Sequence, residues 1–408
     1  MEDAGRAITA ARARVVAALA ARLRDLDLAE DAFAEACAAA LTAWAAEAPR
    51  DPAAWLWRVA LRKAFDPGRR VAVRERASHD PPAPAPTPED LLMAADEPVP
   101  DERLRLIFVC CHPAIAVDAR AALTLKIVCG LSTERLARAF LMAEPAMLQR
   151  ITRAKRKIRD AGVPFEVPRR EAWPERLEAV LATLEIAYAQ AYEDAALAAD
   201  GAPFAQEVLR LSGLLAELMP DEPEVLGLAA LVRYAEARRP ARLDAAGAMV
   251  GLPEQDVGLW RGDLIAVGAR LLDRAANLRR TGPRQILAAI HGAHLSRRET
   301  GITPWTDILM LYDALLVVRP DAVTSVNRAV AVGEAKGAAA GLEALSAIAD
   351  RARLTGWLPY QAARAALCAR AGRSAEAAEA YRAALDLSPA PAERLYLERR
   401  LATLASGG

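Results

Sequence analysis

Several features that mark common protein classes are missing or rare in this sequence. Its 408 residues include five cysteines, an odd number at scattered positions, which does not make the disulfide framework of a small secreted domain. No segment approaches the roughly 18 uninterrupted apolar residues of a membrane span, and the N-terminus has no cleavable apolar block. Glycine-rich phosphate loops and convincing alternating strands are missing too. We therefore expect an all-α, cytoplasmic protein with no membrane attachment and no cofactor.

The net charge is zero, so the overall composition does not point to nucleic acid, but the charge is unevenly distributed. Residues 77–100 contain seven prolines, five acids and no Lys or Arg, which is typical of an extended, semi-rigid linker. Residues 1–76 are nearly balanced, with thirteen basic and eleven acidic residues. Residues 101–170 hold fourteen basic and seven acidic residues, and residues 171–408 are mildly acidic. A compact basic segment therefore follows the linker, and a polyanion is its expected partner.

Apolar residues recur three and four positions apart along most of the chain, which predicts helices. Before residue 165 this pattern covers the stretches 6–23, 28–45, 53–65, 103–112, 119–128, 133–140 and 145–161. A chain of this length is too long for one ordinary core. We expect a helical domain at 1–76, the linker at 77–100, a second helical domain at 101–165, and a helical extension at 171–408.

Residues 131–161, LSTERLARAFLMAEPAMLQRITRAKRKIRDA, predict a short helix, a tight turn and a longer basic helix. Ser132 suits the N-cap of the first helix, and Pro145 suits the first turn of the second. The residues that we expect to be buried are Leu136, Ala137, Phe140, Met147, Leu148, Ile151, Ala154 and Ile158. This order of elements is that of a helix-turn-helix, whose second helix enters the major groove of DNA.

The second of these helices carries six positive charges and no acid within residues 150–159, RITRAKRKIR. Such side chains neutralise phosphates and make binding dependent on salt. Residues near the helix start can reach base edges, and arginine pairs well with guanine. The DNA-binding residues that we expect here are Gln149, Arg150, Arg153, Lys155, Arg156 and Lys157. The alternative is a solvated basic face that binds nothing.

The run ALTLKIVCGLSTERLARAFLMAEPAMLQRITRAKRKIRDAGVPFEVP resembles region four of extracytoplasmic-function sigma factors, which direct bacterial RNA polymerase to promoters. The run DLDLAEDAFAEACAAALTAW resembles the part of region two that docks on the polymerase clamp. PRDPAAWLWRVALRKAFDPGRR is similar to the part that melts and captures the minus-ten element. LMPDEPEVLGLAAL, at 218–231, resembles a signature of the subgroup with a long helical C-terminal extension. The resemblance implies core RNA polymerase, through its β′ clamp and β flap, and promoter DNA as partners.

Within 1–76, aromatic and basic residues alternate in a way that suits the capture of unstacked bases. The expected DNA-binding residues of this segment are Trp57, Arg58, Arg62, Lys63, Arg69 and Arg70. Trp55 and Phe65 are expected in the core of a small bundle. Asp31 and Glu35, one turn apart, are the expected contacts to the polymerase clamp, and a solvent-facing carboxylate pair is the alternative.

The motif Cys110-Cys111-His112 looks like an active site or a metal site. Adjacent residues on a helix are turned by about 100° from one another, so both thiols do not easily face one ion. Zinc sites usually space their ligands as C-x₂-C and need four of them. Since cysteine is also a common small core residue, we expect these thiols to be packing residues, with redox sensing as the alternative.

The C-terminal part contains a spacing of about 34–35 residues, with Gly337 and Gly372 at 35 and Pro320 and Pro389 at about two periods. Around Gly372 the small and aromatic positions of a tetratricopeptide repeat are filled by Ala365, Ala377, Tyr381 and Ala384. Such repeats stack helix pairs around a concave binding face. We expect this extension to contact a protein partner or another part of the chain.

These patterns favour a non-enzymatic transcription initiation subunit. A one-component helix-turn-helix regulator with a repeat-type sensor is the second hypothesis, but it leaves the aromatic and basic helix at 53–70 unexplained. A third hypothesis is an enzyme with helical repeats, for which the only candidate catalytic residues are Cys110-Cys111-His112, His291 and His294.

Overall fold

A computed structural model of the chain describes residues 2–44, 49–65, 102–140, 142–197, 202–349 and 354–406. The described part is all-helical, and its only β interaction is an isolated bridge between Leu243 and Met249. It divides into two compact units, Met1–Gln190 and Ala191–Gly408, which we call unit 1 and unit 2. The expected linker at 77–100 lies outside the described residues. None of the helices in these ranges combines the length and apolar content that a membrane span requires.

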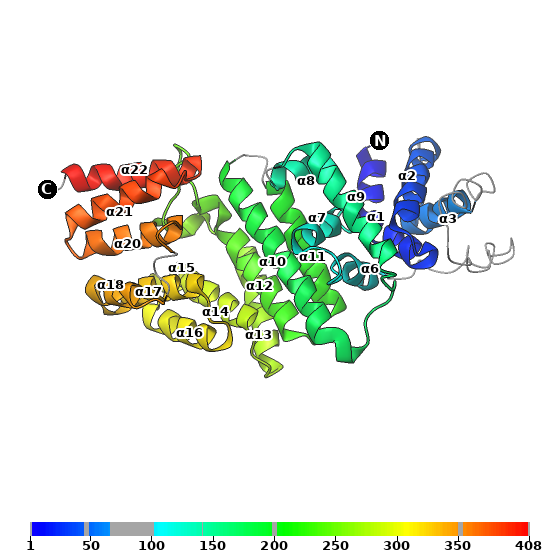
Figure 1. Cartoon of the computed structure of the whole chain (residues 1–408). Coiled ribbons are helices and arrows are strands. Elements are labelled where there is room, and N and C mark those ends of the chain that lie inside the picture. Colours follow the sequence, from blue (N-terminus) through cyan, green and yellow to red (C-terminus); the bar gives the residue numbers. More distant parts are fainter. Residues whose placement is uncertain are drawn as a thin grey trace. The chain divides into compact units, whose positions relative to one another are not determined.

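Unit 1 contains the seven helices that the sequence predicts before residue 165, and an eighth that begins in it and continues into unit 2 (Figure 1). They are α1 (Glu2–Leu23), α2 (Leu26–Ala43), α3 (Pro52–Ala64), α6 (Arg103–Cys110), α7 (Val117–Ile127), α8 (Thr133–Ala139), α9 (Glu144–Asp160) and α10 (Trp173–Leu197). Local capping explains several of the boundaries. The Asp25 carboxylate accepts the Asp27 N–H at 2.8 Å and starts α2, and Asp51 starts α3 in the same way.

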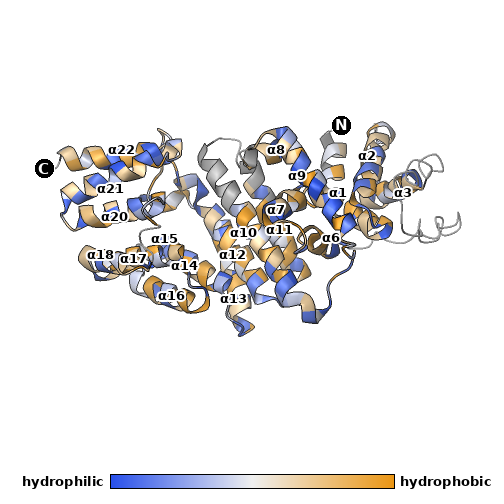
Figure 2. Ribbon diagram, in the orientation of Figure 1, coloured by the Kyte–Doolittle hydropathy of each residue, from blue (hydrophilic) through white to orange (hydrophobic). Residues whose placement is uncertain are grey.

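The core of unit 1 forms where α1 packs against α2, α3 and α6. Figure 2 shows apolar and polar residues interspersed along these helices, and most of their buried residues are apolar. Phe108 of α6 is fully buried, and Arg176 of α10 lies over its ring at 5.9 Å and donates to its carbonyl oxygen at 2.8 Å. Residues 171–190, which the sequence groups with the extension, thus contribute to unit 1.

Unit 2 consists mainly of helices that pack against their neighbours in chain order. Its helices are α11 (Ala202–Leu218), α12 (Pro223–Arg238), α13 (Gly262–Asn277), α14 (Pro283–Leu295), α15 (Arg297–Thr300), α16 (Trp305–Val318), α17 (Ala322–Lys336), α18 (Ala338–Ser346), α20 (Leu358–Arg370), α21 (Ser374–Asp386) and α22 (Pro391–Ser406). The four residues expected at repeat positions, Ala365, Ala377, Tyr381 and Ala384, are all buried. Gly337 and Gly372 have φ of 99° and 74°, and each follows the end of a helix.

The start of α14 is tied to α12 by a half-buried polar contact. Glu224 accepts the backbone N–H groups of Arg284 at 3.1 Å and Gln285 at 3.2 Å, and so caps the positive end of α14. A Cβ on Gly282 would lie 2.3 Å from the Glu224 carboxyl carbon, so a larger residue here would displace the Glu224 side chain from this position.

Candidate nucleic-acid interface

The short helix α8 and the basic helix α9 form one compact element of unit 1. The Ser132 hydroxyl accepts the Arg135 N–H at 3.2 Å, which confirms Ser132 as the N-cap of α8. Helix α9 packs against α7 and α8 through four buried side chains, Met147, Ile151, Ala154 and Ile158. Gly162, with φ of 58°, ends α9, since its left-handed conformation lets the Val163 N–H reach the Ile158 carbonyl.

Two expectations about burial in this element are wrong. Leu148 is 55% exposed, because it lies about 100° around α9 from the buried Met147. Phe140, at the end of α8, is half-buried rather than buried. The remaining predicted core residues of α8 and α9 are confirmed as buried.

The outward face of α9 carries Gln149, Arg153, Arg156 and Lys157, all exposed. None of the three cations forms an ion pair with another residue in the described ranges. An exposed cationic face on a helix that stands free on one side has the geometry and the charge to meet a polyanion. Four of the six side chains expected at DNA thus lie on solvent-facing positions.

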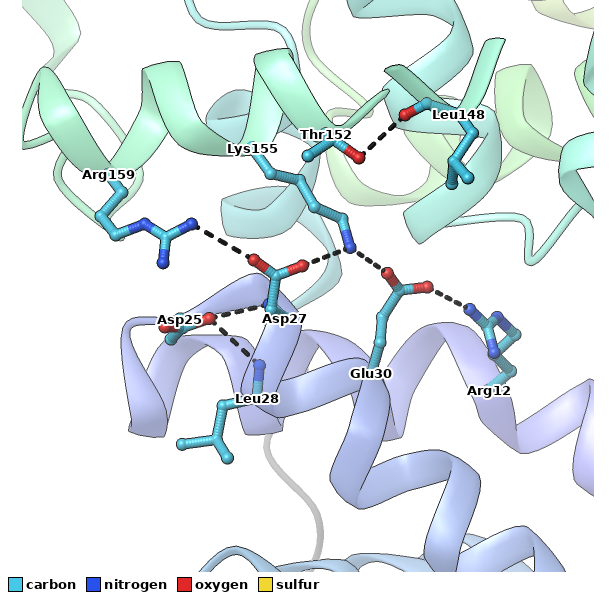
Figure 3. Close-up of polar contacts among 9 residues, drawn as sticks. All are labelled: Arg12, Asp25, Asp27, Leu28, Glu30, Leu148, Thr152, Lys155 and Arg159. Carbon is cyan, nitrogen blue, oxygen red and sulfur yellow. Dashed lines mark hydrogen bonds and ion pairs between the residues drawn. The ribbon is translucent and has the colours of Figure 1, made fainter. Parts of the chain in front are cut away.

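The other two expected DNA-binding residues of α9 make ion pairs within unit 1. Arg150 Nη2 lies 3.2 Å from Asp118 Oδ2 at the start of α7. The Lys155 ammonium lies 2.7 Å from Asp27 Oδ1 and 2.8 Å from Glu30 Oε2, both on α2 (Figure 3). The Lys155 side chain is only 14% exposed.

The contact around Lys155 is part of a larger ionic cluster, consisting of Arg12, Asp27, Glu30, Lys155 and Arg159. Arg12 Nη2 lies 3.0 Å from Glu30 Oε1, and Arg159 Nη2 lies 3.4 Å from Asp27 Oδ2. Burial alone lowers the pKa of Lys155, but the charge of Glu30 and the hydrogen bonds to Asp27 and Glu30 outweigh it, so the pKa is raised. Lys155 therefore stays charged in this position.

Sequence reasoning missed this cluster. Asp27 and Glu30 lie three residues apart on one face of α2, which was a weak signal. Nothing local indicates that their partner is Lys155, which lies 128 residues beyond Asp27 in the chain.

The helices α1, α2 and α3 form what we call the N-terminal bundle. The burial of its Trp55 and Trp57 is the reverse of the expectation. Trp57 is only 7% exposed and belongs to the core. Trp55 is half-buried, with its ring in edge contact with that of Trp44 at 5.2 Å. Residues two apart on a helix point about 200° apart, so one of this pair had to face inward.

The basic residues of this bundle lie on α3. Arg62 and Lys63 are exposed and Arg58 is half-buried, whereas Arg69 and Arg70 lie outside the described residues. The expected clamp contacts are both on α2, where Asp31 is exposed and Glu35 is half-buried. Phe65, at the end of α3, is half-buried.

The thiols of Cys110 and Cys111 are buried, as expected for packing residues. Cys111 Sγ lies 3.3 Å from Thr124 Oγ1, and burial raises the pKa of both thiols. Burial also lowers the pKa of His112, helped by the charges of Arg176 and Arg120. Within the described ranges, no three His, Cys, Asp or Glu side chains lie together as a metal site would need.

We expect the native protein to resist thiol alkylation. Burial raises the pKa of the half-buried Cys37 from 9.0 to about 11, although the charge of Arg12 lowers it. A higher pKa leaves less thiolate at a given pH, so at pH 8 Cys37 should react with iodoacetamide about 100-fold more slowly than an ordinary thiol. Cys110 and Cys111 should react more slowly still.

Mass spectrometry after timed alkylation measures these rates, and unfolding in urea should make all five cysteines reactive. Rapid labelling of Cys110 or Cys111 in the folded protein would contradict the packing role.

Comparison with known proteins gives matches over the whole chain and over part of it. A protein from Rhizobium meliloti (strain 1021), named Uncharacterized protein R00370, is 39% identical over 415 residues, covering 98% of this chain and 95% of the relative. The chain belongs to the family of this rhizobial protein. Residues 176–276 also match a family of unknown function, DUF6596. No solved structure matches the chain.

Proposed function

We propose that the chain is a sigma factor of the extracytoplasmic-function type, which directs bacterial core RNA polymerase to promoters for transcription initiation. The observation that carries this proposal is the pairing, in unit 1, of a helical bundle ending in exposed cations with a short-helix, turn, basic-helix element. These two parts suit the two jobs of such a subunit. One holds an opened strand and the other reads duplex DNA.

In this proposal α9 enters the major groove of the minus-thirty-five element. Gln149 and Arg153 lie near its N-terminal end, where side chains of a recognition helix meet base edges. Arg156 and Lys157 lie further along on the exposed side and suit phosphate contacts.

The N-terminal bundle takes the minus-ten element and the polymerase. Arg62 and Lys63 on α3 are exposed and suit the backbone of an opened strand. Asp31 and Glu35 on α2 face the β′ clamp in this proposal, and the α6–α9 region contacts the β flap. Trp57 is a core residue, so Trp55, which is only half-buried, is the better candidate to stack on a base.

Unit 2 has a regulatory role in the proposal, through tetratricopeptide-like helix pairs that bind a partner protein. The burial of Ala365, Ala377, Tyr381 and Ala384 supports this assignment, because small residues at these positions let paired helices approach closely. The chain acts without catalysis or cofactor of its own and works in the cytoplasm.

Transcription in vitro tests the proposal. Core polymerase free of other sigma factors, the purified chain and genomic DNA of its host are combined, and transcript 5′ ends are sequenced. We expect defined start sites that need the chain and share upstream elements. Core polymerase alone is the control. Duplex binding without initiation would contradict the proposal and favour the one-component regulator.

A further inference from the structure

The ionic cluster of unit 1 joins the two parts that the proposed function separates. Lys155, in the C-terminal half of α9, is held between Asp27 and Glu30 of α2 at 2.7 and 2.8 Å (Figure 3). Arg159, one turn further along α9, adds a second contact to Asp27 at 3.4 Å. Both cations lie on a flank of α9 that meets carboxylates of α2; Lys155 is largely covered there, whereas Arg159 stays 60% exposed.

We propose that this cluster is a latch, in which Asp27 and Glu30 occupy the place of DNA phosphates on α9 and hold unit 1 in a closed resting state. Carboxylates and phosphates both accept charge-assisted hydrogen bonds from ammonium and guanidinium groups. One ammonium cannot serve both at full strength, so DNA binding along this flank competes with the latch.

If the proposed function holds, on which this inference rests, the closed state also spans too short a distance to reach both promoter elements. Elements named minus ten and minus thirty-five are separated by about 25 base pairs, or roughly 85 Å of duplex at 3.4 Å per base pair. A compact unit of this size has a radius of gyration of about 16 Å. Lys155 and Asp27 in direct contact therefore cannot belong to a state that reaches both elements. The 36 residues 66–101, which join the two parts, span at most about 120 Å when fully extended, enough to bridge that gap.

The latch can open without leaving a buried charge alone. Once Lys155 and Arg159 move to phosphates, Glu30 keeps its ion pair with Arg12 at 3.0 Å. Lys126 lies close enough for the Glu30 charge to act on its pKa, although burial dominates and lowers that pKa. Asp27 is half-exposed and regains water. Neither state thus carries the large cost of an unpaired buried ion.

Zero-length cross-linking of the full chain tests the latch. A water-soluble carbodiimide joins a lysine amine to a carboxylate only in direct contact, and peptide mass spectrometry locates the joined residues. We expect a link from Lys155 to Asp27 or Glu30 in the free protein, and its loss when a mixed-sequence 30-base-pair duplex is added to saturation. A link that is absent without DNA, or that persists at saturating DNA, would overturn the proposal.

Two internal controls assign the link. Lys157 faces away from α2 and should give no link to it. K155R keeps the charge but has no amine to couple, so its link should vanish.

Charge-neutral variants give an independent measurement. D27N/E30Q should bind the same duplex about 5-fold more tightly than the unchanged chain, because the closed form loses its ionic contacts and is less populated, although the packing of α1 on α6 remains. The matched control E171Q/E175Q removes two exposed carboxylates of unit 1 away from the latch, and should change affinity less than about 2-fold. An equal gain in both variants would reduce the effect to net charge and overturn the latch.

The outcomes separate this inference from the proposed function. A link lost on DNA addition in a chain that fails to initiate transcription supports the latch and removes the sigma-factor role. Transcription initiation by a chain whose link is unaffected by DNA supports the sigma-factor role and overturns the latch.

Discussion

Replacing Arg153, Arg156 and Lys157 together with glutamine should lower affinity for duplex DNA by roughly 500-fold at 0.1 M salt. All three side chains are exposed on α9. Arg156 and Lys157 suit phosphate contacts, and each such contact contributes about 0.9 to the slope of log affinity against log salt, so their loss should flatten that slope by about 1.8. The loss of Arg153 from a base edge adds about 1–3 kcal/mol. Fluorescence anisotropy with a labelled duplex at several salt concentrations measures both quantities.

The matched control for this variant removes three exposed arginines of unit 2, Arg270, Arg298 and Arg382. It makes the same change in net charge, and should leave the salt slope within about 0.5 of the original if α9 is the DNA-binding helix. An α9 variant whose slope matches that of the unchanged chain would show that this face is merely solvated. Because the substituted residues are exposed, circular dichroism should report unchanged helix content in both.

Phe108→Ala should destabilise unit 1 by about 3–5 kcal/mol, because a fully buried ring is replaced by a cavity. Arg176, which lies over this ring at 5.9 Å, also loses its packing surface. Hydrogen exchange measured by mass spectrometry on peptides from α1 and α7 reports on unit 1 alone. Their slowest amides should exchange several hundred-fold or more faster than in the unchanged protein.

Leu148→Ala is the informative comparison, because the sequence pattern predicts a core residue there. At 55% exposure its truncation should cost less than about 0.5 kcal/mol. A cost similar to that of Phe108→Ala would mean that α9 packs differently in solution.

The contrast between these two residues shows what local sequence patterns predict well. The helices before residue 165 were predicted with boundaries within a few residues, because helical periodicity and caps act over short distances. Met147, Ile151, Ala154 and Ile158 follow that period, and all are buried. Leu148 breaks it, since apolar character alone does not place a side chain on the buried face.

Local sequence patterns do not predict which distant segments of the chain come into contact. Trp55 and Trp57 alternate around one helix, and only the position of α1 and α2 decides which of them is covered. In the sequence, nothing distinguishes Lys155 from the other basic residues of α9. In the structure, it alone among them lies against two carboxylates of α2. Its partners were visible in the sequence only as ordinary surface acids.

The contact between Glu224 and the N-terminus of α14 bears on how fragments of this protein should be made. The segment 176–276 begins within unit 1 and ends before Pro283, where α14 starts. Expressed alone, it would leave Glu224 without the N–H groups of Arg284 and Gln285, and would uncover the face of α12 that packs on α14. A soluble truncation therefore has to retain α14, whatever boundaries sequence similarity suggests.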